Sequence, residues 1–171
     1  MRRKIILAAL LLACTCLLGA AQHETSSKSG IAAVSTTTPS SELPNNELIY
    51  INSSKAIQKD YQDDLLYSIK VLKGFTDTNI TDINALSAST SLYTLTSVSF
   101  NALSGLEPPD KYKKYHGYLG NALAYLMLME WSLAKLYETN NINYFNMSRD
   151  EANLSVRYHD QAMKELGNIT T

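Results

Sequence analysis

Between residues 110 and 138, large apolar side chains recur every three or four positions, and this repeat limits the possible folds more than any other feature. The spacing matches the turn of an α-helix and places one apolar stripe along its length. The stripe contains Tyr112, Tyr115, Leu119, Leu123, Leu126, Leu133 and Tyr137, and is widened by Met127, Met129 and Trp131. So broad an apolar surface is typical of a helix that packs on more than one side.

Residues 48–73 form another apolar-periodic segment, with charged residues on its other faces. The predicted inner face consists of Ile57, Tyr61, Leu65, Ile69 and Leu72. Gly74 follows the segment, and a glycine just past the last turn commonly ends a helix. We therefore expect a first helix that stops at Gly74.

Residues 80–103 also predict a helix, although they are rich in Ser and Thr, which are poor helix formers. Composition alone permits a strand here, but a lone strand among helices has no partner, which favours the helix. The predicted stripe consists of Ile83, Leu86, Tyr93 and Phe100, widened by Leu92, Leu95 and Val98. Gly105, Pro108 and Pro109 are expected to end this helix, and Pro109 suits the start of the next.

The last helix is predicted to begin at Ser148, because the four residues from Ser148 to Glu151 have the pattern of a capping box. In that motif the serine side chain accepts from the glutamate N–H, and the glutamate side chain reaches back. The predicted inner face consists of Ala152, Leu154 or Ser155, Tyr158, Ala162 and Leu166. Gly167 is expected to close the helix.

Four amphipathic helices with short connections predict an all-α fold, an antiparallel four-helix bundle, over residues 45–171. The connection from Leu106 to Pro109 is the shortest that the sequence suggests. It is expected to make the second and third helices neighbours.

A basic start and a short apolar run mark residues 1–21 as a predicted secretory signal. The apolar run is shorter than the roughly 20 residues of a membrane-spanning helix. A small-residue site before Gln22 predicts ordinary secretion. The sequence Leu-Leu-Ala-Cys ending at Cys14 instead resembles the lipobox of prokaryotic lipoproteins, in which the cysteine carries the lipid. We favour lipidation of Cys14, which predicts a location on the outer face of the cell membrane.

Residues 22–44 are predicted to form a disordered tether, because ten of these 23 residues are Ser or Thr and few are large and apolar. A tether between a lipid anchor and a domain is a coherent arrangement. Cleavage before Cys14 also removes three basic residues and makes the net charge more negative than -1. An acidic surface argues against nucleic acid as a partner, because such binding rests on Lys and Arg.

The sequence offers no catalytic, cofactor or metal motif. Gly-x-Ser-x-Gly, Gly-rich phosphate loops and Glu-x-x-His are all missing from it. His116 and His159 are predicted to lie on the third and fourth helices and could face each other, but no helix supplies matching carboxylates. We therefore expect no enzyme, no cofactor and no bound metal.

Two groups of polar or aromatic residues deserve a functional interpretation. Glu130 follows Leu126 by four positions, so it either points inward, where burial would raise its pKa, or lies at the edge of the stripe and reaches water. A possible binding surface consists of Tyr112, Tyr115, His116 and Tyr118. The alternative for the tyrosines is that they close one end of the bundle with their hydroxyls at its rim.

Five Asn-x-Ser/Thr sequons are possible N-glycosylation sites in an exported protein. They begin at Asn52, Asn79, Asn146, Asn153 and Asn168. A lipobox together with sequons suits an archaeal cell surface.

Residues 103–138, LSGLEPPDKYKKYHGYLGNALAYLMLMEWSLAKLYE, resemble a pattern in small lipoproteins of archaea and bacteria whose helical domain has no known function. There a Leu-rich turn precedes Pro-Pro, and the next helix carries a histidine within two turns. Leu106, Pro108, Pro109 and His116 carry the resemblance. It implies a helical domain on an exported anchor and no catalytic residue.

These features predict an exported, lipid-anchored binding or interaction module without enzymatic activity. Its expected contacts are the membrane, through the anchor, and an envelope protein or polymer that the sequence does not identify. The alternative is a ligand-sensing or metal-handling helical bundle. In that alternative Glu130 and a histidine would converge on a polar cavity, whereas a dry core of Leu and Tyr would argue against it.

Overall fold

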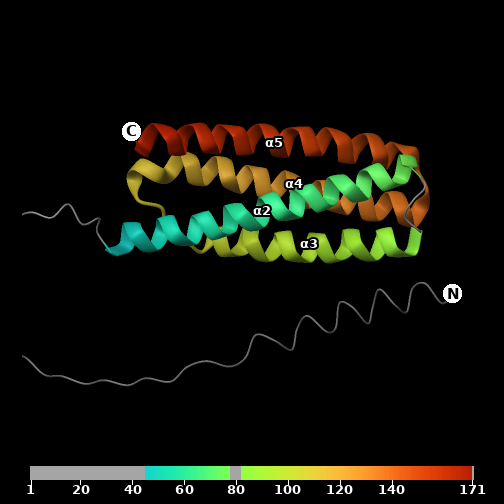
Figure 1. Ribbon diagram of the computed structural model, residues 1–171, viewed down its shortest axis with the longest axis horizontal. Coiled ribbons are helices and arrows are strands. Elements are labelled where there is room, and N and C mark those ends of the chain that lie inside the picture. Colours follow the sequence, from blue (N-terminus) through green and yellow to red (C-terminus); the bar gives the residue numbers. More distant parts are fainter. Residues whose placement is uncertain (1–44, 78–81, 171) are drawn as a thin grey trace, which may run out of the picture. The chain divides into compact units, whose positions relative to one another are not determined.

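The computed structural model describes residues 45–77 and 82–170, and these residues are all-α. They form four α-helices: α2 (Asn45–Asp77), α3 (Asp82–Ser104), α4 (Lys113–Thr139) and α5 (Ile142–Thr170). A 3₁₀ turn, η2 (Asp110–Tyr112), lies directly before α4. The helices lie side by side along their lengths (Figure 1). The predicted signal, Cys14, the tether and the sequon at Asn79 lie outside the described residues.

Helices α2 and α4 each contact the other three helices, whereas α3 and α5 do not contact each other. Helix α4 has its most extensive contacts with α5 and α3. The seven residues of its predicted stripe are buried, and Leu119, Leu123, Leu126 and Leu133 are fully so. Of the three residues expected to widen the stripe, Met129 is buried, Met127 is half-buried and Trp131 is exposed, so the prediction is wrong for Trp131. The prediction of a helix packed on several sides is therefore confirmed. The neighbouring positions of α3 and α4 are confirmed as well.

The predicted start of the last helix is wrong, because α5 begins at Ile142, six residues before Ser148. Asn140 adopts a left-handed conformation with φ 53° and donates its N–H to the Leu136 carbonyl at 2.7 Å, which ends α4. Asn141 then caps α5 by accepting from the backbone N–H of Asn143 at 3.0 Å. The shortest connection is therefore this Asn-Asn pair rather than residues 106–109.

Ser148 lies inside α5 and forms no capping box there. It is fully buried, and its hydroxyl donates to the Phe145 carbonyl at 3.0 Å. Packing favours the longer helix, because Phe145 lies 5.6 Å from the ring of Phe75 and Tyr144 lies 5.9 Å from that of Trp131.

Neither Gly74 nor Gly167 ends its helix, since α2 continues to Asp77 and α5 to Thr170. A glycine marks a helix end when it takes a positive φ. None of the described glycines has one. Both residues therefore continue the helix, against the prediction from sequence.

Helix α3 is rotated relative to its predicted stripe. Its buried side chains are mostly small or polar and consist of Ala85, Ser89, Leu92, Thr96, Ser99 and Leu103. Ile83, Tyr93, Leu95 and Val98 are exposed instead, at 78%, 39%, 56% and 62%. The prediction that these four residues face the core is wrong, whereas Leu92 is buried and Leu86 and Phe100 pack against the core as predicted.

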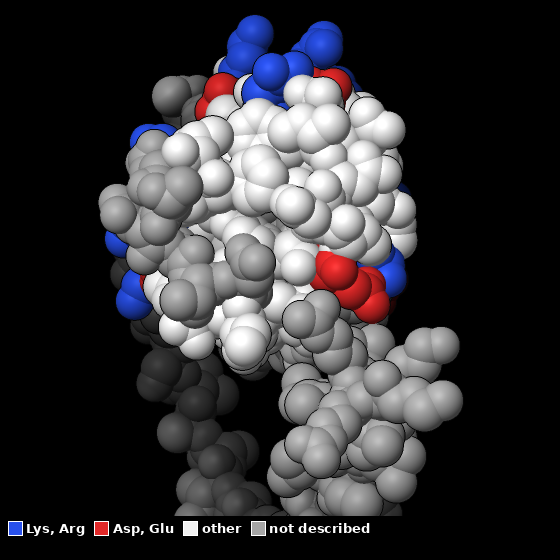
Figure 2. All heavy atoms as spheres, turned by 90° about the vertical axis from the view of Figure 1, so that its right-hand side faces the viewer, with Lys and Arg blue, Asp and Glu red and all other residues white. Residues whose placement is uncertain are grey.

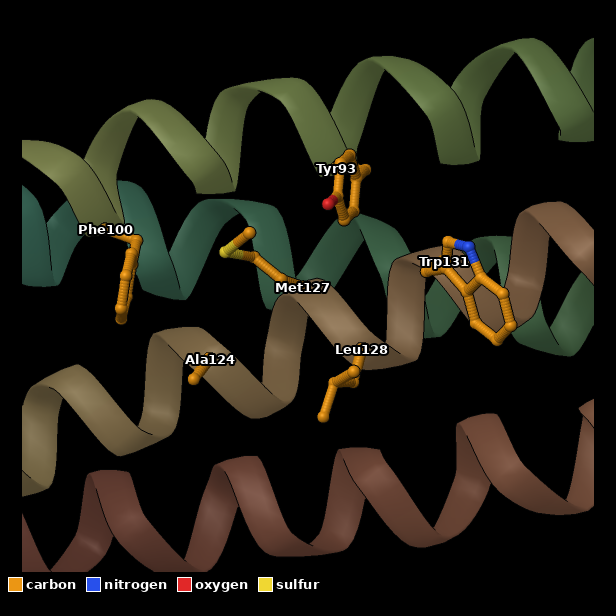
Figure 3. A pocket seen from close by; sticks show the side chains of 6 residues that line it. All are labelled: Tyr93, Phe100, Ala124, Met127, Leu128 and Trp131. Atoms are coloured by element: carbon orange, nitrogen blue, oxygen red, sulfur yellow. The ribbon is translucent and has the colours of Figure 1, made fainter.

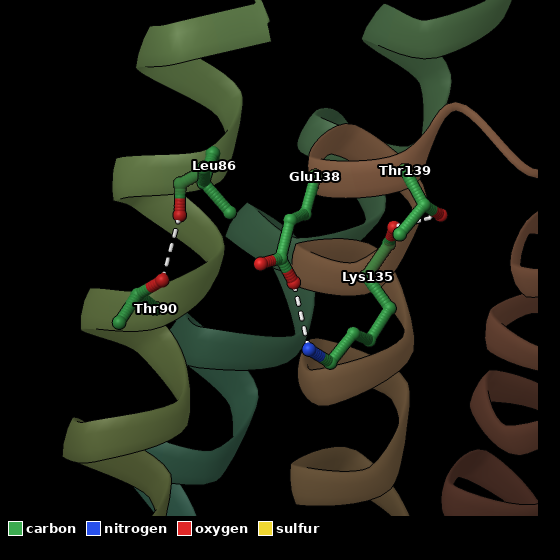
Figure 4. Close-up of polar contacts among 5 residues, drawn as sticks. All are labelled: Leu86, Thr90, Lys135, Glu138 and Thr139. Atoms are coloured by element: carbon green, nitrogen blue, oxygen red, sulfur yellow. Dashed lines mark hydrogen bonds and ion pairs between the residues drawn. The ribbon is translucent and has the colours of Figure 1, made fainter. Parts of the chain in front are cut away.

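The Ser and Thr residues of α3 are compatible with a helix because their hydroxyls bond to the helix's own carbonyls. Thr90 donates to the Leu86 carbonyl at 2.9 Å (Figure 4), and Ser89 donates to that of Ala85 at 2.8 Å. In the same view, Thr139 donates to the Lys135 carbonyl at the end of α4, and Lys135 pairs with Glu138 at 2.7 Å.

We expect Asn141→Ala to lower the free energy of unfolding by about 1 kcal/mol, because it removes the side chain that caps α5. Urea denaturation followed by circular dichroism measures this loss. Asn143→Ala is the matched control, since it keeps the backbone N–H that Asn141 accepts from. Equal losses in Asn141→Ala and Asn143→Ala would show that the Asn141 side chain does not cap α5.

Candidate functional site

Glu130 occupies the interior of the helical domain. The sequence left open whether this side chain points inward or reaches water. The structure shows that it points inward and is fully buried. Its Oε1 lies 3.0 Å from the Ser68 hydroxyl on α2 and 3.0 Å from the Thr96 hydroxyl on α3. Its Oε2 is buried without a hydrogen-bond partner. The carboxyl group of α4 thus meets two hydroxyls from two other helices.

The hydroxyl of Thr96 lies between two carboxyl groups, because it is also 3.3 Å from Oδ2 of Asp64. A hydroxyl carries one proton and can donate to only one of them. Both contacts are satisfied when one of the two carboxyl groups is protonated: a protonated Glu130 can donate to Thr96, which then donates to Asp64, or a protonated Asp64 can donate to Thr96, which then donates to Glu130. The hydrogen bonds therefore form a chain from the buried Glu130 to the partly exposed Asp64.

Burial is also the main reason why the pKa of Glu130 is raised from 4.5 to about 8. The hydrogen bonds from Thr96 and Ser68 oppose this shift, and the negative charge of Asp64 adds to it. Burial likewise raises the pKa of Asp64. At neutral pH burial favours the protonated form of Glu130, which is compatible with the hydrogen-bond geometry.

The two histidines of the helical domain do not bond to Glu130. His116 contacts Tyr50 through its Nδ1 at 3.3 Å, and the His159 ring stacks on Tyr61 at 4.7 Å. Burial lowers the pKa of both histidines. Among the described residues, no group of three or more His, Cys, Asp or Glu side chains could hold a metal ion.

The proposed tyrosine surface is largely inside the protein. Tyr112 is 3% exposed and Tyr115 is fully buried, so neither is available to a partner, and only His116 and Tyr118 are half-buried. The first turn of α2 covers this region. Glu47 accepts from the Tyr112 hydroxyl at 3.2 Å and pairs with Lys111 at 2.6 Å.

A shallow apolar groove runs between α3 and α4, on the outside of the molecule (Figure 3). It has a volume of about 530 Å³ and is lined by Tyr93, Phe100, Ala124, Met127, Leu128 and Trp131. Leu128 and Trp131 are 47% and 41% exposed. From the sequence these side chains were assigned to core stripes or left unassigned, so the groove was missed.

The surface around the groove carries little charge, with Lys135 at its edge over the ring of Trp131. Residues 83–106 contain no Lys, Arg, Asp or Glu, and within residues 115–134 the only one is the buried Glu130. Charged side chains gather instead at other places, for example along the α5 edge of the end view (Figure 2). The run without charge in residues 83–106 is the sequence signal that could have revealed this surface.

The four sequons in the described part of the chain, at Asn52, Asn146, Asn153 and Asn168, all have exposed asparagines. They lie on helices α2 and α5 rather than in loops. Among the described helices, none combines the length and the apolar character needed to cross a bilayer. No family model matches the sequence, and comparisons with curated proteins and with solved structures gave no significant match.

Proposed function

We propose that this chain is a non-enzymatic binding module that binds its partner through the outer surface of α3 and α4. The surface, here called the α3–α4 face, consists of Tyr93, Phe100, Ala124, Met127, Leu128 and Trp131. The observation that carries the proposal is that these side chains form an uncharged, partly exposed apolar patch with a groove in it. Such patches commonly mark interaction sites in soluble domains.

The composition of the α3–α4 face suits a binding surface. Trp and Tyr are the residues that most often dominate the energy of protein interfaces. Two contacts hold Trp131 in place, because its ring lies 5.9 Å from that of Tyr144 and Lys135 lies 6.0 Å from the ring centre. A pre-positioned aromatic side chain loses little freedom on binding.

The proposed scaffold for this face is an antiparallel four-helix bundle. The order of the contacts supports it: Trp131 meets Tyr144, whereas Tyr125, earlier in α4, meets Tyr158, later in α5. Contacts between α2 and α4 run in the same direction instead. Tyr50, early in α2, meets His116, early in α4, and the Val71 carbonyl, late in α2, accepts from the Tyr137 hydroxyl, late in α4, at 2.8 Å. Alternating directions of this kind are expected of an up-down-up-down bundle.

The proposed location is the outer face of the cell membrane, with a lipid on Cys14 and residues 22–44 as the tether. Support comes from the basic residues and the apolar run near the start of the sequence, and from the lipobox-like residues that end at Cys14. The exposed sequons on α2 and α5 would be accessible to glycosylation after export, and none lies on α3 or α4. Glycans at these positions would leave the α3–α4 face uncovered.

The binding proposal is tested with the full chain, carrying a C-terminal tag, as bait in detergent extracts of the native membrane. We expect an enriched envelope component whose capture falls roughly tenfold when Leu128→Lys places a charge in the groove. Leu66→Lys on α2 is the matched control, because Leu66 is 55% exposed and lies outside the face. Binding as the main role loses its basis if the wild-type bait enriches nothing above a mock column.

A further inference from the structure

We infer that one proton shared by Glu130 and Asp64 holds α3 against the rest of the domain, and thereby keeps the two walls of the groove in the α3–α4 face together. This regulation rests on the proposed function, because it acts on the same surface. It also has a direction: when the proton is lost, α3 opens and the groove loses one of its walls. The support comes from the position of the shared proton, from the packing of α3 and from the charges around Glu130.

The hydrogen bond between Thr96 and Glu130 lies on the inner side of the groove. Thr96 follows Tyr93 by three positions and precedes Phe100 by four, so these three side chains share one side of α3. On α4, Glu130 follows Met127 by three positions in the same way. Tyr93, Phe100 and Met127 line the groove, whereas Thr96 and Glu130 are fully buried. The 3.0 Å contact between the Thr96 hydroxyl and Glu130 therefore ties the α3 wall of the groove to its α4 wall.

Helix α3 is held in place by few large apolar side chains. Leu92 and Leu103 are buried, and Leu86 and Phe100 pack partly against the core. The other buried residues of the helix are small and consist of Ala85, Ser89, Thr96 and Ser99. An element that buries little apolar surface opens at a lower free energy than the rest of a domain. A polar contact can therefore decide whether α3 stays in place, whereas α4 is fixed by its buried leucines.

The contact is satisfied only while the two carboxyl groups hold a proton between them. Thr96 has one proton to donate, so when both groups are ionised one carboxylate loses its bond to the hydroxyl. Oε2 of Glu130 already lies buried without a hydrogen-bond partner. A buried charge without enough partners is costly, and the two negative charges also repel each other. Movement of α3 away from α4 admits water to both groups, so loss of the proton favours the open form.

The charges that face Glu130 from the neighbouring helices do not offset this cost. Burial raises the pKa of Glu130 to about 8, and among the described residues the charge that acts on it is Asp64 of α2. Asp60 and Asp63 act on Asp64 in turn and add negative charge beside it. Helix α3 carries no Lys, Arg, Asp or Glu after its first residue. On α5, the pKa of Glu151 responds to other neighbours and not to Glu130. The charge of Glu130 is thus removed by a proton and not by a cationic side chain.

Hydrogen exchange of single backbone amides, measured by NMR on the full chain in detergent, tests this regulation. The open form binds one proton fewer between about pH 5 and about pH 8, so the opening constant of α3 should rise about tenfold per pH unit. Amides from Leu92 to Phe100 should open together, and more often than those of α4 around Leu123. In Glu130→Gln the opening constant should rise far less. Comparison of the variants at equal pH removes the intrinsic pH dependence of exchange, and Glu138→Gln is the control that should follow the wild type.

A second variant protects the test in case Glu130→Gln alters the fold. In Asp64→Asn the opening constant should stop rising at a lower pH than in the wild type, because the negative charge that opposes ionisation of Glu130 is gone. Asp63→Asn, at the exposed position beside it, should leave the pH dependence nearly unchanged. Wild-type behaviour of both Glu130→Gln and Asp64→Asn would overturn the shared proton. Amides of α3 that open no more often than those of α4 would also overturn it, because only the whole domain would then unfold. Neither result needs a partner, whereas a bait that captures nothing removes the binding function and leaves the exchange pattern as it is.

Discussion

Glu130→Gln is expected to remove most of the loss of stability that the wild-type chain shows as the pH rises from about 4.5 to about 8. The substitution keeps the shape of the side chain and a carbonyl oxygen that can accept from Ser68 and Thr96. It removes the ionisable group. The free energy of unfolding of the variant should therefore exceed that of the wild type at pH 8 and be similar or lower at pH 4.5.

The sign follows from the proton count of the two states. Burial raises the pKa of Glu130 to about 8 in the folded chain, whereas the unfolded chain has the ordinary value near 4.5. Between these values the folded state binds the extra proton. Stability is therefore complete below about pH 4.5 and falls as the pH rises, by at most about 1.4 kcal/mol per unit, until the folded state also loses its proton.

Urea denaturation at a series of pH values from 4 to 9 measures this difference. Glu138→Gln is the matched control, because Glu138 lies on the same helix but is exposed. It should leave the slope of stability against pH unchanged. Equal slopes in the wild type and in Glu130→Gln would show that Glu130 is ionised in the folded chain at neutral pH and would contradict the proposed proton arrangement.

Other wholly or partly buried groups determine how the free energy of unfolding of Glu130→Gln still depends on pH. Burial raises the pKa of Asp64 and of Glu151, so both also destabilise the fold as the pH rises. Among the described residues, Asp64 is the charged group that faces Glu130, from α2; α3 contributes only the Thr96 hydroxyl. His116 and His159 have the opposite sign, because their lowered pKa values make the folded state bind fewer protons, and stability rises with pH through their range.

The sequence predicts α4 well because one energy term decides its structure. Leu119, Leu123 and Leu126 are large, apolar and regularly spaced, so hydrophobic burial and helix periodicity indicate the same face. The position of Glu130 could not be derived in this way. Its burial depends on Ser68 and Thr96, which lie 62 and 34 residues away in the sequence, and only the fold brings them into contact.

The error on α3 has the same origin. Periodicity assigns large apolar residues to the inside, but the inside of α3 must supply a hydroxyl to Glu130. Thr96 fulfils this role, and the small side chains of Ala85, Ser89 and Ser99 lie on the same buried side. Once Thr96 faces inward, Tyr93 and Val98 must face outward, because they lie on other sides of the helix. The buried polar contact and the exposed apolar face are thus two consequences of one helix rotation.

This rotation is tested by a pair of identical substitutions on α3. Leu92 is 5% exposed and Leu95, less than one turn away, is 56% exposed. Leu92→Ala should lower the free energy of unfolding by about 3 kcal/mol, because it leaves a cavity among packed side chains. Leu95→Ala should lower it by less than about 1 kcal/mol, because that side chain is already largely in water.

Urea denaturation of both variants at one pH and at low protein concentration gives the comparison, with the slope against denaturant as a check on two-state unfolding. The difference between the two losses matters more than either value, since the deleted atoms are the same. Similar losses would mean that Leu95 is as well packed as Leu92 and that α3 turns its apolar side to the core after all. The exposed apolar surface of α3, on which the proposed binding function depends, would then be smaller than the structure gives.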